Sequence, residues 1–179
     1  MLRLFAGLAI PEPIRLQLTT MTGGIAGARW VAPENLHLSL RFIGEVDEGA
    51  AEDIDAALGQ IIAAPVVVAL AGIGCFETRG RAHTLWAGAE ASAALLHLQA
   101  RVEAQVGRAG LPPEGRKFTP HVTLARMQRT PVEQIAPYLT DHGGFRAAPF
   151  EAEDFLLYRS HLGHAAANYE VLARYPLTG

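Results

Sequence analysis

The stretches His37-Leu38-Ser39-Leu40 and His121-Val122-Thr123-Leu124 are two copies of one pattern: histidine, apolar residue, hydroxyl residue, apolar residue. Side chains alternate between the two faces of a β-strand, so each copy predicts a strand that presents an imidazole and a hydroxyl on one face. The apolar residues point to the other face and anchor the strand in the core. The two copies therefore predict a pair of half-buried strands, each with a polar working face.

Two such motifs are more than the composition provides by chance. With 7 histidines and 13 serines and threonines among 179 residues, about 0.5 matches to His-x-Ser/Thr are expected, and the apolar flanks reduce this number further. One match alone is typical of a structural polar group on a strand. Two matches in equivalent places indicate a shared function.

The order of the predicted elements also repeats. Each half of the chain reads strand, helix, histidine strand, helix, strand, and the two motif histidines are 84 residues apart (121 − 37). The same offset relates the predicted strand at Val66 to the one at Phe150. We therefore expect an internal repeat of about 1–82 and 83–179, which forms a single domain of two lobes with a cleft between them.

Local signals predict where the elements begin and end. Asp47 is expected to cap a helix that runs to about residue 63, Ser92 to cap a helix that ends at Gly110, and Thr130-Pro131-Val132-Glu133 to form a capping box. The buried side of the first of these helices is expected to carry Ile54, Leu58, Ile61 and Ile62. Strands are predicted at 2–9, 36–42, 66–70, 84–87, 119–126, 149–159 and 168–176.

The composition describes a globular protein. Half of the residues are hydrophobic (50%), 18% are charged, and the formal net charge is −3, which favours a packed core and argues against coating duplex DNA through bulk charge. No apolar run reaches the roughly 18 residues of a membrane helix, and we find no secretory signal pattern. One cysteine, Cys75, excludes an intramolecular disulfide framework. We expect a cytoplasmic protein with no membrane contact.

Two histidines and two hydroxyls across a cleft point to acid–base chemistry on a phosphodiester. Histidine titrates near neutral pH, so one imidazole can act as a base while the other is still a protonated acid. Cleavage without a metal needs this pairing, because one group takes a proton from the attacking oxygen and the other protonates the leaving oxygen. His37 and His121 are the predicted catalytic residues, and Ser39 and Thr123 are predicted to hydrogen-bond the non-bridging phosphate oxygens.

Arginines near the motifs are predicted to strengthen this phosphate site. Arg41 follows His37 by four residues, which in a regular strand places it on the histidine face. Arg126 follows His121 by five residues, so a bulge or the end of the strand is needed to bring it to that face. Four other basic residues are expected to rim the cleft and meet a polynucleotide backbone, or to be ordinary surface charges. They are Arg79, Arg81, Arg116 and Lys117.

A two-histidine metal site is the competing chemistry. Zinc needs a third protein ligand, and neither motif has a carboxylate or thiol at the usual ligand spacing. We interpret Cys75 as a packing residue and the remaining histidines as surface residues, one on a helix and the others in turns. The sequence therefore predicts no metal and no cofactor. The remaining histidines are His83, His97, His142, His161 and His164.

The motifs and their surroundings resemble the 2H phosphoesterase superfamily. More closely, the chain resembles its bacterial and archaeal RNA 2′,3′-cyclic phosphodiesterases, also called 2′-5′ RNA ligases, over nearly its whole length. The segments that carry this resemblance are Arg3-Leu4-Phe5, Asn35 to Val46 (NLHLSLRFIGEV), Leu85-Trp86-Ala87-Gly88, Phe118 to Arg126 (FTPHVTLAR), Tyr158-Arg159-Ser160 and Tyr169-Glu170-Val171-Leu172.

The resemblance implies a fold and a reaction. The fold is α+β and bilobal, with two antiparallel sheets flanking a central cleft and helices on the outside. The reaction is the metal-independent hydrolysis of an RNA terminal 2′,3′-cyclic phosphate to a 2′-phosphate, with His37 as the proton donor and His121 as the acceptor that activates water. The roles swap in the reverse direction, 2′-5′ RNA ligation. Ser39 stands where threonine is more usual, and it keeps the hydroxyl but loses the stiffness of a β-branched side chain.

The expected partners are RNA ends or oligonucleotides with a 2′,3′-cyclic phosphate, tRNA fragments among them, and we expect a monomer. Two other functions stay open at this point. One is a nucleotide- or RNA-end-binding module without significant catalysis; the other is a phosphodiesterase for a small cyclic nucleotide or an ADP-ribose cyclic phosphate. The intact histidines and hydroxyls of both motifs favour catalysis.

Overall fold

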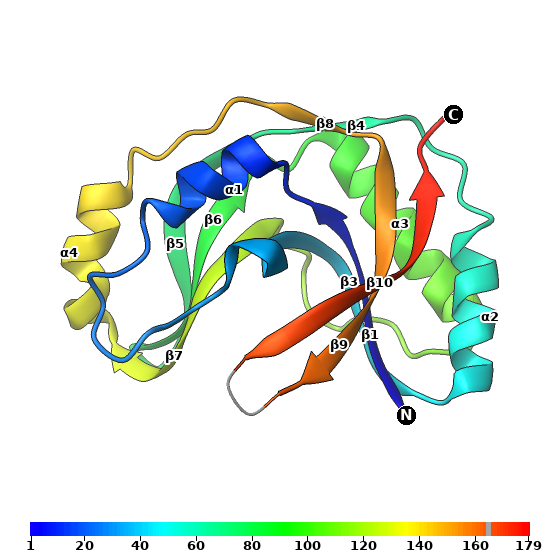
Figure 1. Ribbon diagram of the computed structural model, residues 1–179, viewed down its shortest axis with the longest axis horizontal. Coiled ribbons are helices and arrows are strands. Elements are labelled where there is room, and N and C mark those ends of the chain that lie inside the picture. The colour runs from blue at the N-terminus through cyan, green and yellow to red at the C-terminus, as the bar shows by residue number, and fades with distance from the viewer. Residues whose placement is uncertain (164–165) are drawn as a thin grey trace.

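Antiparallel strands with helices around them make up the structure (Figure 1). The computed structural model describes residues 1–163 and 166–179. The strands are β1 Leu2–Ala9, β2 Arg29–Trp30, β3 His37–Val46, β4 Val66–Val68, β5 Leu70–Thr78, β6 Arg81–Ala89, β7 His121–Pro131, β8 Phe150–Ala152, β9 Asp154–Leu162 and β10 Ala167–Pro176. The helices are α1 Glu12–Thr19, α2 Glu48–Leu58, α3 Ala93–Arg108 and α4 Val132–His142, with a 3-10 helix η1 at Pro33–Asn35.

The two histidine strands, β3 and β7, are neighbours at the centre of the larger sheet. Its strands follow the order β10-β9-β1-β3-β7-β6-β5, with β2 also on β7, and β4 pairs with β8 in a second sheet. The pairings are antiparallel, which confirms the predicted fold class. The β10-β9-β1-β3 side of the larger sheet is joined to its β7-β6-β5 side where β3 pairs with β7, at Leu38 and Val122.

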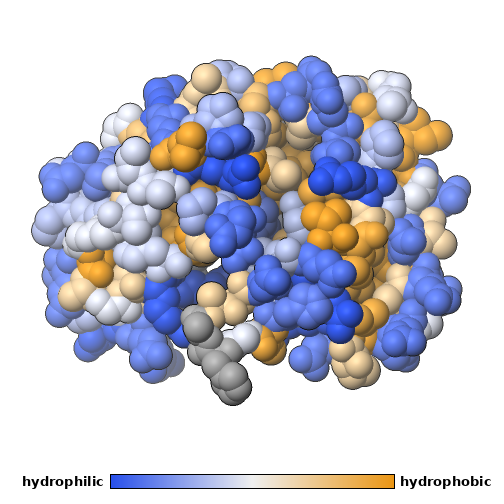
Figure 2. Space-filling view, in the orientation of Figure 1, coloured by the Kyte–Doolittle hydropathy of each residue, from blue (hydrophilic) through white to orange (hydrophobic). Residues whose placement is uncertain are grey.

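Elements of the two halves recur at the offset read from the sequence. Helices α2 and α4 begin 84 residues apart (132 − 48), and so do strands β4 and β8 (150 − 66) and strands β5 and β9 (154 − 70). In Figure 1, α2 (cyan) and α4 (yellow) lie at opposite ends of the molecule. The face shown in Figure 2 is hollowed near its middle.

The predicted caps of α2 and α3 are present. Asp47 accepts a hydrogen bond from the Ala50 amide (2.8 Å) at the start of α2, and Ser92 accepts one from the Leu95 amide (3.2 Å) at the start of α3. Helix α2 ends at Leu58, earlier than predicted. Beyond that end Ile61 is buried, whereas Ile62 is 73% exposed and does not join the core.

The predicted capping box at the start of α4 does not form. Strand β7 continues through Pro131, which takes the N-cap position without a side-chain hydrogen bond. The reason is sheet pairing, because Thr130 and Pro131 lie opposite Ala82 and Arg81 of β6. Thr130 and Pro131 therefore have strand conformation, and Thr130 does not take the N-cap position that the capping box requires.

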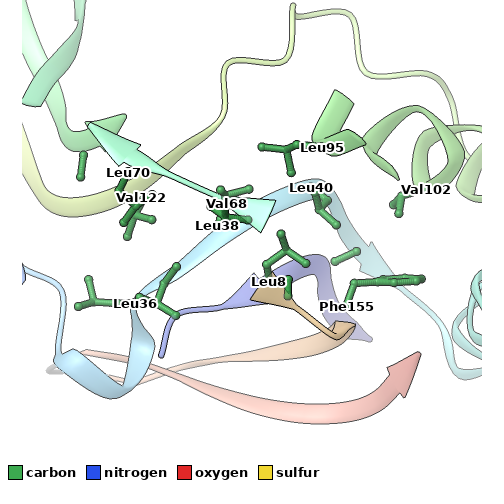
Figure 3. Packing of buried hydrophobic residues seen from close by; sticks show 14 of the residues in the cluster. Leu8, Leu36, Leu38, Leu40, Val68, Leu70, Leu95, Val102, Val122 and Phe155 are labelled. Carbon is green, nitrogen blue, oxygen red and sulfur yellow. The ribbon is translucent and has the colours of Figure 1, made fainter. Parts of the chain in front are cut away.

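The apolar face of the two histidine strands forms the centre of the core (Figure 3). Leu38 and Val122 are fully buried there, in the same cluster as Leu95 of α3. The histidine face is therefore the opposite face of the sheet.

Helices of each half of the chain contact elements of the other half, so the two halves pack together. Helix α3 belongs to the second half of the chain but packs against α2 and β3 of the first. After α1, in the first half, the Met21 carbonyl accepts a hydrogen bond from the Tyr138 hydroxyl of α4 (2.6 Å). In addition, the Gln17 side chain donates to the Arg146 carbonyl (2.8 Å).

Among the described residues, none of the helices has the length and apolar character required to cross a membrane.

Candidate active site

Both motifs fold as the alternation predicts. Their apolar residues are buried, and their histidines and hydroxyls lie half-buried on the other face of the sheet. The buried residues are Leu38, Leu40, Val122 and Leu124. The half-buried residues are His37, Ser39, His121 and Thr123.

The register between β3 and β7 brings the two motifs together. Because Leu38 pairs with Val122 on antiparallel strands, His37 lies across from Thr123 and Ser39 lies across from His121. Each histidine therefore has a hydroxyl from its own strand one pleat away and the hydroxyl of the other strand opposite it. This places two imidazoles and two hydroxyls on one patch of the sheet.

The two imidazoles are held in the same way. Nδ1 of His37 donates to the Asn35 carbonyl (2.7 Å), and Nδ1 of His121 donates to the Thr119 carbonyl (2.6 Å). A carbonyl only accepts, so both Nδ1 atoms carry a proton and the neutral rings keep Nε2 as an acceptor. Nε2 of His37 accepts from the Ser39 hydroxyl (2.9 Å).

A β-bulge follows the hydroxyl residue in both strands. Leu40 and Leu124 are the extra residues, because pairing skips them against the neighbouring strand. The pairs around them are Gly7 with Ser39, Ala6 with Arg41, Trp86 with Thr123 and Leu85 with Ala125. A bulge reverses the alternation beyond it. Arg126 is thereby returned to the histidine face, where it is exposed, as the sequence required.

In β3, the bulge at Leu40 moves Arg41 away from the histidine face, so the predicted position of Arg41 is wrong. Its side chain is only 7% exposed, and its Nε lies 2.8 Å from a carboxylate oxygen of Glu103 on α3. The guanidinium also donates to the Pro112 carbonyl (2.6 Å) and lies 3.4 Å from Glu114. Arg41 thus holds β3 against α3 and the loop that leads to His121.

The four basic residues predicted to rim the cleft lie near the two ends of β7 and not on that strand. Arg81 lies opposite Pro131, at the end of β7 far from His121, with Arg79 in the adjoining turn. Arg116 forms an ion pair with Glu114 at 3.3 Å, and Lys117 is exposed in the loop before His121.

Aromatic rings enclose His37. The ring centroids of Phe5, Tyr169 and Tyr158 lie 4.6, 5.2 and 5.9 Å from that of the imidazole. Sequence reasoning assigned no role to these residues. Their signal was indirect, because each belongs to a segment that carries the family resemblance without being part of a motif.

His121 has a different aromatic neighbourhood. Phe76 lies edge-on to it at 4.9 Å between centroids, and Trp86 lies at 6.4 Å. The Trp86 ring rests on the backbone of Gly74, where a Cβ atom would be 2.4 Å from Cη2 of the indole. Gly74 is therefore the residue that leaves room for Trp86 beside His121.

Burial makes both imidazoles weak bases. The pKa of His37 is lowered to about 4, mainly by burial; the bond to Asn35 opposes this change, and the positive charges of Arg126 and His121 add to it. The pKa of His121 is also lowered, mainly by burial and in addition by Arg126. Arg126 therefore acts electrostatically on both histidines.

The other described histidines lie on elements other than β3 and β7. His97 is on α3, as expected, but His83 lies on β6 and His161 on β9, where it contacts Glu170 at 2.7 Å. His142 ends α4 beside Tyr138, and His164 lies outside the described residues. Over 1–163 and 166–179, no group of three or more histidine, cysteine or acidic residues is arranged to hold a metal. Cys75 lies within β5 and packs against the core, and burial raises the pKa of its thiol.

Comparison with known proteins identifies the family. The profile of the 2′-5′ RNA ligase superfamily matches residues 10–164. The chain belongs to this superfamily. A Thermus thermophilus relative named RNA 2′,3′-cyclic phosphodiesterase is 33% identical over 189 residues, covering 99% of this chain and 91% of its own. An Archaeoglobus fulgidus relative of the same name is 27% identical over 90% of this chain and 92% of its own.

Solved structures of superfamily members share the fold. The crystal structure of E. coli LigT in apo form has a TM-score of 0.81 and 26% identity, and covers 99% of this chain and 98% of its own. A Thermus thermophilus structure, TT0787, also has a TM-score of 0.81, with 30% identity over 98% of this chain and 97% of its own. LigT has also been crystallised with 3′-AMP.

Proposed function

We propose that this member of the superfamily hydrolyses the terminal 2′,3′-cyclic phosphate of RNA to a 2′-phosphate, with His37 and His121 as the proton-transfer pair. The name shared by its relatives supports the substrate. The observation that carries the proposal is the pairing of Leu38 with Val122. It sets a histidine and a hydroxyl from each strand around one patch, as an in-line displacement on phosphorus requires.

The reaction needs one proton taken and one proton given. In the direction implied by the family, Nε2 of His121 accepts a proton from water as the water oxygen attacks phosphorus. The bond from phosphorus to O3′ then breaks, and Nε2 of His37 donates a proton to O3′. Both Nδ1 atoms stay bound to backbone carbonyls, so each ring keeps its orientation and presents the other nitrogen to substrate.

The hydroxyls and Arg126 would stabilise the charge that grows on the phosphate. Ser39 and Thr123 are placed to donate to non-bridging oxygens, and the guanidinium of Arg126 adds a positive charge on the same face. Arg41 has no part in this scheme, because its guanidinium is held by Glu103 and Pro112.

Protonation of the free protein sets the pH dependence. Hydrolysis needs one imidazole charged and the other neutral, and the pKa values of both are below the ordinary value of about 6.5. Above both values the singly protonated form falls tenfold for each pH unit. We therefore expect kcat/KM to peak at acidic pH and to fall about tenfold per unit above about pH 6.5. A bound phosphate, being negative, raises both pKa values, so the fall in kcat begins at higher pH.

We also propose that the chain is one domain made of an internal repeat, about 1–82 and 83–179. The offset of 84 residues between α2 and α4, β4 and β8, and β5 and β9 supports this. So does the matching bulge at Leu40 and Leu124. On this proposal each repeat contributes one histidine and one hydroxyl.

A product assay tests the proposed function. An oligoribonucleotide that ends in a 2′,3′-cyclic phosphate is incubated with the protein in excess EDTA, and the terminal phosphate is identified by 31P NMR. We expect a 2′-phosphate from the wild type, and about a thousandfold slower reaction in His37→Ala and in His121→Ala. His97→Ala, on the exposed side of α3, is the matched control. Binding of the RNA without turnover, or full activity in either motif variant, would overturn the proposal.

A further inference from the structure

Two arginines lie directly opposite each other beside the active site. Strand β2 pairs with β7 so that Arg29 faces Arg126 and Trp30 faces Ala125. Side chains opposite in this way share one face, with Cβ atoms about 5 Å apart, and like charges in this position repel each other. An anion bound between the two guanidinium groups relieves that repulsion.

The arginine pair lies on the histidine face. Ala125 is fully buried, and the Trp30 ring packs 5.8 Å from that of Tyr138, so these two point into the core. The residues that alternate with them, Arg29 and Arg126, point away from it, and both are exposed. Arg126 is near enough to act electrostatically on both motif histidines.

The charges of the pair are available to a ligand. Within 1–163 and 166–179, neither Arg29 nor Arg126 forms an ion pair, whereas Arg41, Arg116 and Arg174 each have an acidic partner. Arg29 extends the positive surface from Arg126 along the edge of β7, beyond the point where β3 pairs with that strand.

We propose that Arg29, beside Arg126, binds the phosphodiester that links the terminal nucleotide of the RNA to the one before it. This inference rests on the proposed function, which puts the terminal phosphate between the histidines. An RNA chain carries a further phosphate one nucleotide away; Arg126 serves the terminal phosphate, and Arg29 beside it offers the further phosphate a site with no base contact. The enzyme therefore prefers RNA chains to mononucleotides and does so without regard to sequence.

A comparison of two substrates tests this proposal. One is a mononucleoside 2′,3′-cyclic phosphate; the other is a trinucleotide with the same terminal group. We expect Arg29→Gln to lower kcat/KM on the trinucleotide roughly fivefold, and on the mononucleotide by clearly less. Arg108→Gln removes an exposed arginine at the end of α3, which packs on the core side of β3, and is expected to change neither value. Equal losses on both substrates, or no loss on the trinucleotide, would overturn the proposal.

Equilibrium binding separates this inference from the proposed function. Fluorescence anisotropy of a labelled trinucleotide 3′-phosphate, measured at several salt concentrations, requires no turnover. We expect Arg29→Gln to weaken binding and to reduce the slope of log Kd against log salt by about 0.7, the loss of one phosphate contact in a single strand. If the wild type binds but cleaves neither substrate, the proposed function fails, and the change in slope still decides the role of Arg29. An unchanged slope contradicts it.

Discussion

The strand that carries His37 and the strand that carries His121 are built alike, but their neighbours differ. In both strands Nδ1 of the histidine donates to a carbonyl two residues earlier, and a bulge follows the hydroxyl residue. His37 is enclosed by three aromatic rings and is the more buried of the two. His121 contacts Phe76 and Trp86 and is more open.

This difference shows how the same local backbone can place two histidines in different surroundings. The shared backbone fixes where each imidazole points, whereas side chains at corresponding positions set its charge and accessibility. Counted by the offset of 84, Phe42 of β3 corresponds to Arg126 of β7, and the buried Arg41 corresponds to Ala125. The two imidazoles therefore lie in different surroundings, and burial lowers the pKa of His37 more than that of His121.

Arg126 provides the largest difference between the halves. We expect Arg126→Gln to lower kcat/KM about a hundredfold, because in the proposed function it removes a charge that stabilises the phosphate. The substitution also raises the pKa of both histidines, since Arg126 lowers both, and this shift can be read from their NMR titrations. Arg108→Gln is the matched control. Unchanged histidine titrations in Arg126→Gln would contradict the electrostatic role.

The burial of His37 predicts a loss of stability in acid. Its pKa is about 4 in the folded protein and about 6.5 in the unfolded chain. The unfolded chain therefore binds more protons between these values, and the free energy of unfolding falls as the pH drops through this window, by about 3 kcal/mol. Urea unfolding at pH 7 and pH 4 measures the fall. It should be clearly smaller in His37→Gln and unchanged in His97→Gln; an equal fall in all three proteins would refute the assignment.

The second motif has a tryptophan beside it on the neighbouring strand, and the first motif does not. Opposite Thr123 stands Trp86, but opposite Ser39 stands Gly7. We expect Gly74→Ala to reduce the free energy of unfolding by about 2 kcal/mol, because its Cβ would overlap the indole. It should also slow turnover by displacing a neighbour of His121. Gly107→Ala, in α3 with no heavy atom within 4 Å of the new Cβ, should not destabilise the protein. Equal stabilities for the two variants would contradict the packing described.

The two motif hydroxyls, of Ser39 and Thr123, are expected to have the smallest effect on activity. Ser39→Ala and Thr123→Ala should each lower kcat/KM about tenfold, the loss of one hydrogen bond to a charged group. Ser39→Ala should have the greater effect on the NMR titration of His37, because its hydroxyl already donates to Nε2 of that ring. Ser39→Thr keeps the hydroxyl and should keep most of the activity. If Ser39→Thr loses as much kcat/KM as Ser39→Ala, the proposed role of the hydroxyl is contradicted.

The sequence was sufficient for the frame of the fold and for the placement of the two motif histidines and two motif hydroxyls on one face of the sheet. Alternation in the two motifs and the 84-residue offset predicted the histidine strands and the order of the elements around them. Apolar periodicity and cap residues located α2 and α3 because those signals are local.

The face of Arg41, the start of α4 and the aromatic neighbours of His37 could not be predicted, because they depend on contacts between residues distant in sequence. The bulge at Leu40 exchanged the faces of Arg41 and Phe42, so the regular alternation gave the wrong face for Arg41. The capping box at Thr130 gave way to pairing with β6. The rings around His37 come from β1, β9 and β10, which are distant in sequence and meet only when the sheet forms.

The most direct test of the paired-histidine mechanism is the rate of the double variant His37→Ala/His121→Ala. Hydrolysis of the RNA 2′,3′-cyclic phosphate is measured in EDTA for the wild type, both single variants and the double variant, all shown to be folded by circular dichroism. Two groups that act in one step lose their effect together. We therefore predict that the double variant is no slower than the slower single variant. Rate losses that multiply, so that the double variant falls by the product of the two single effects, would contradict the mechanism.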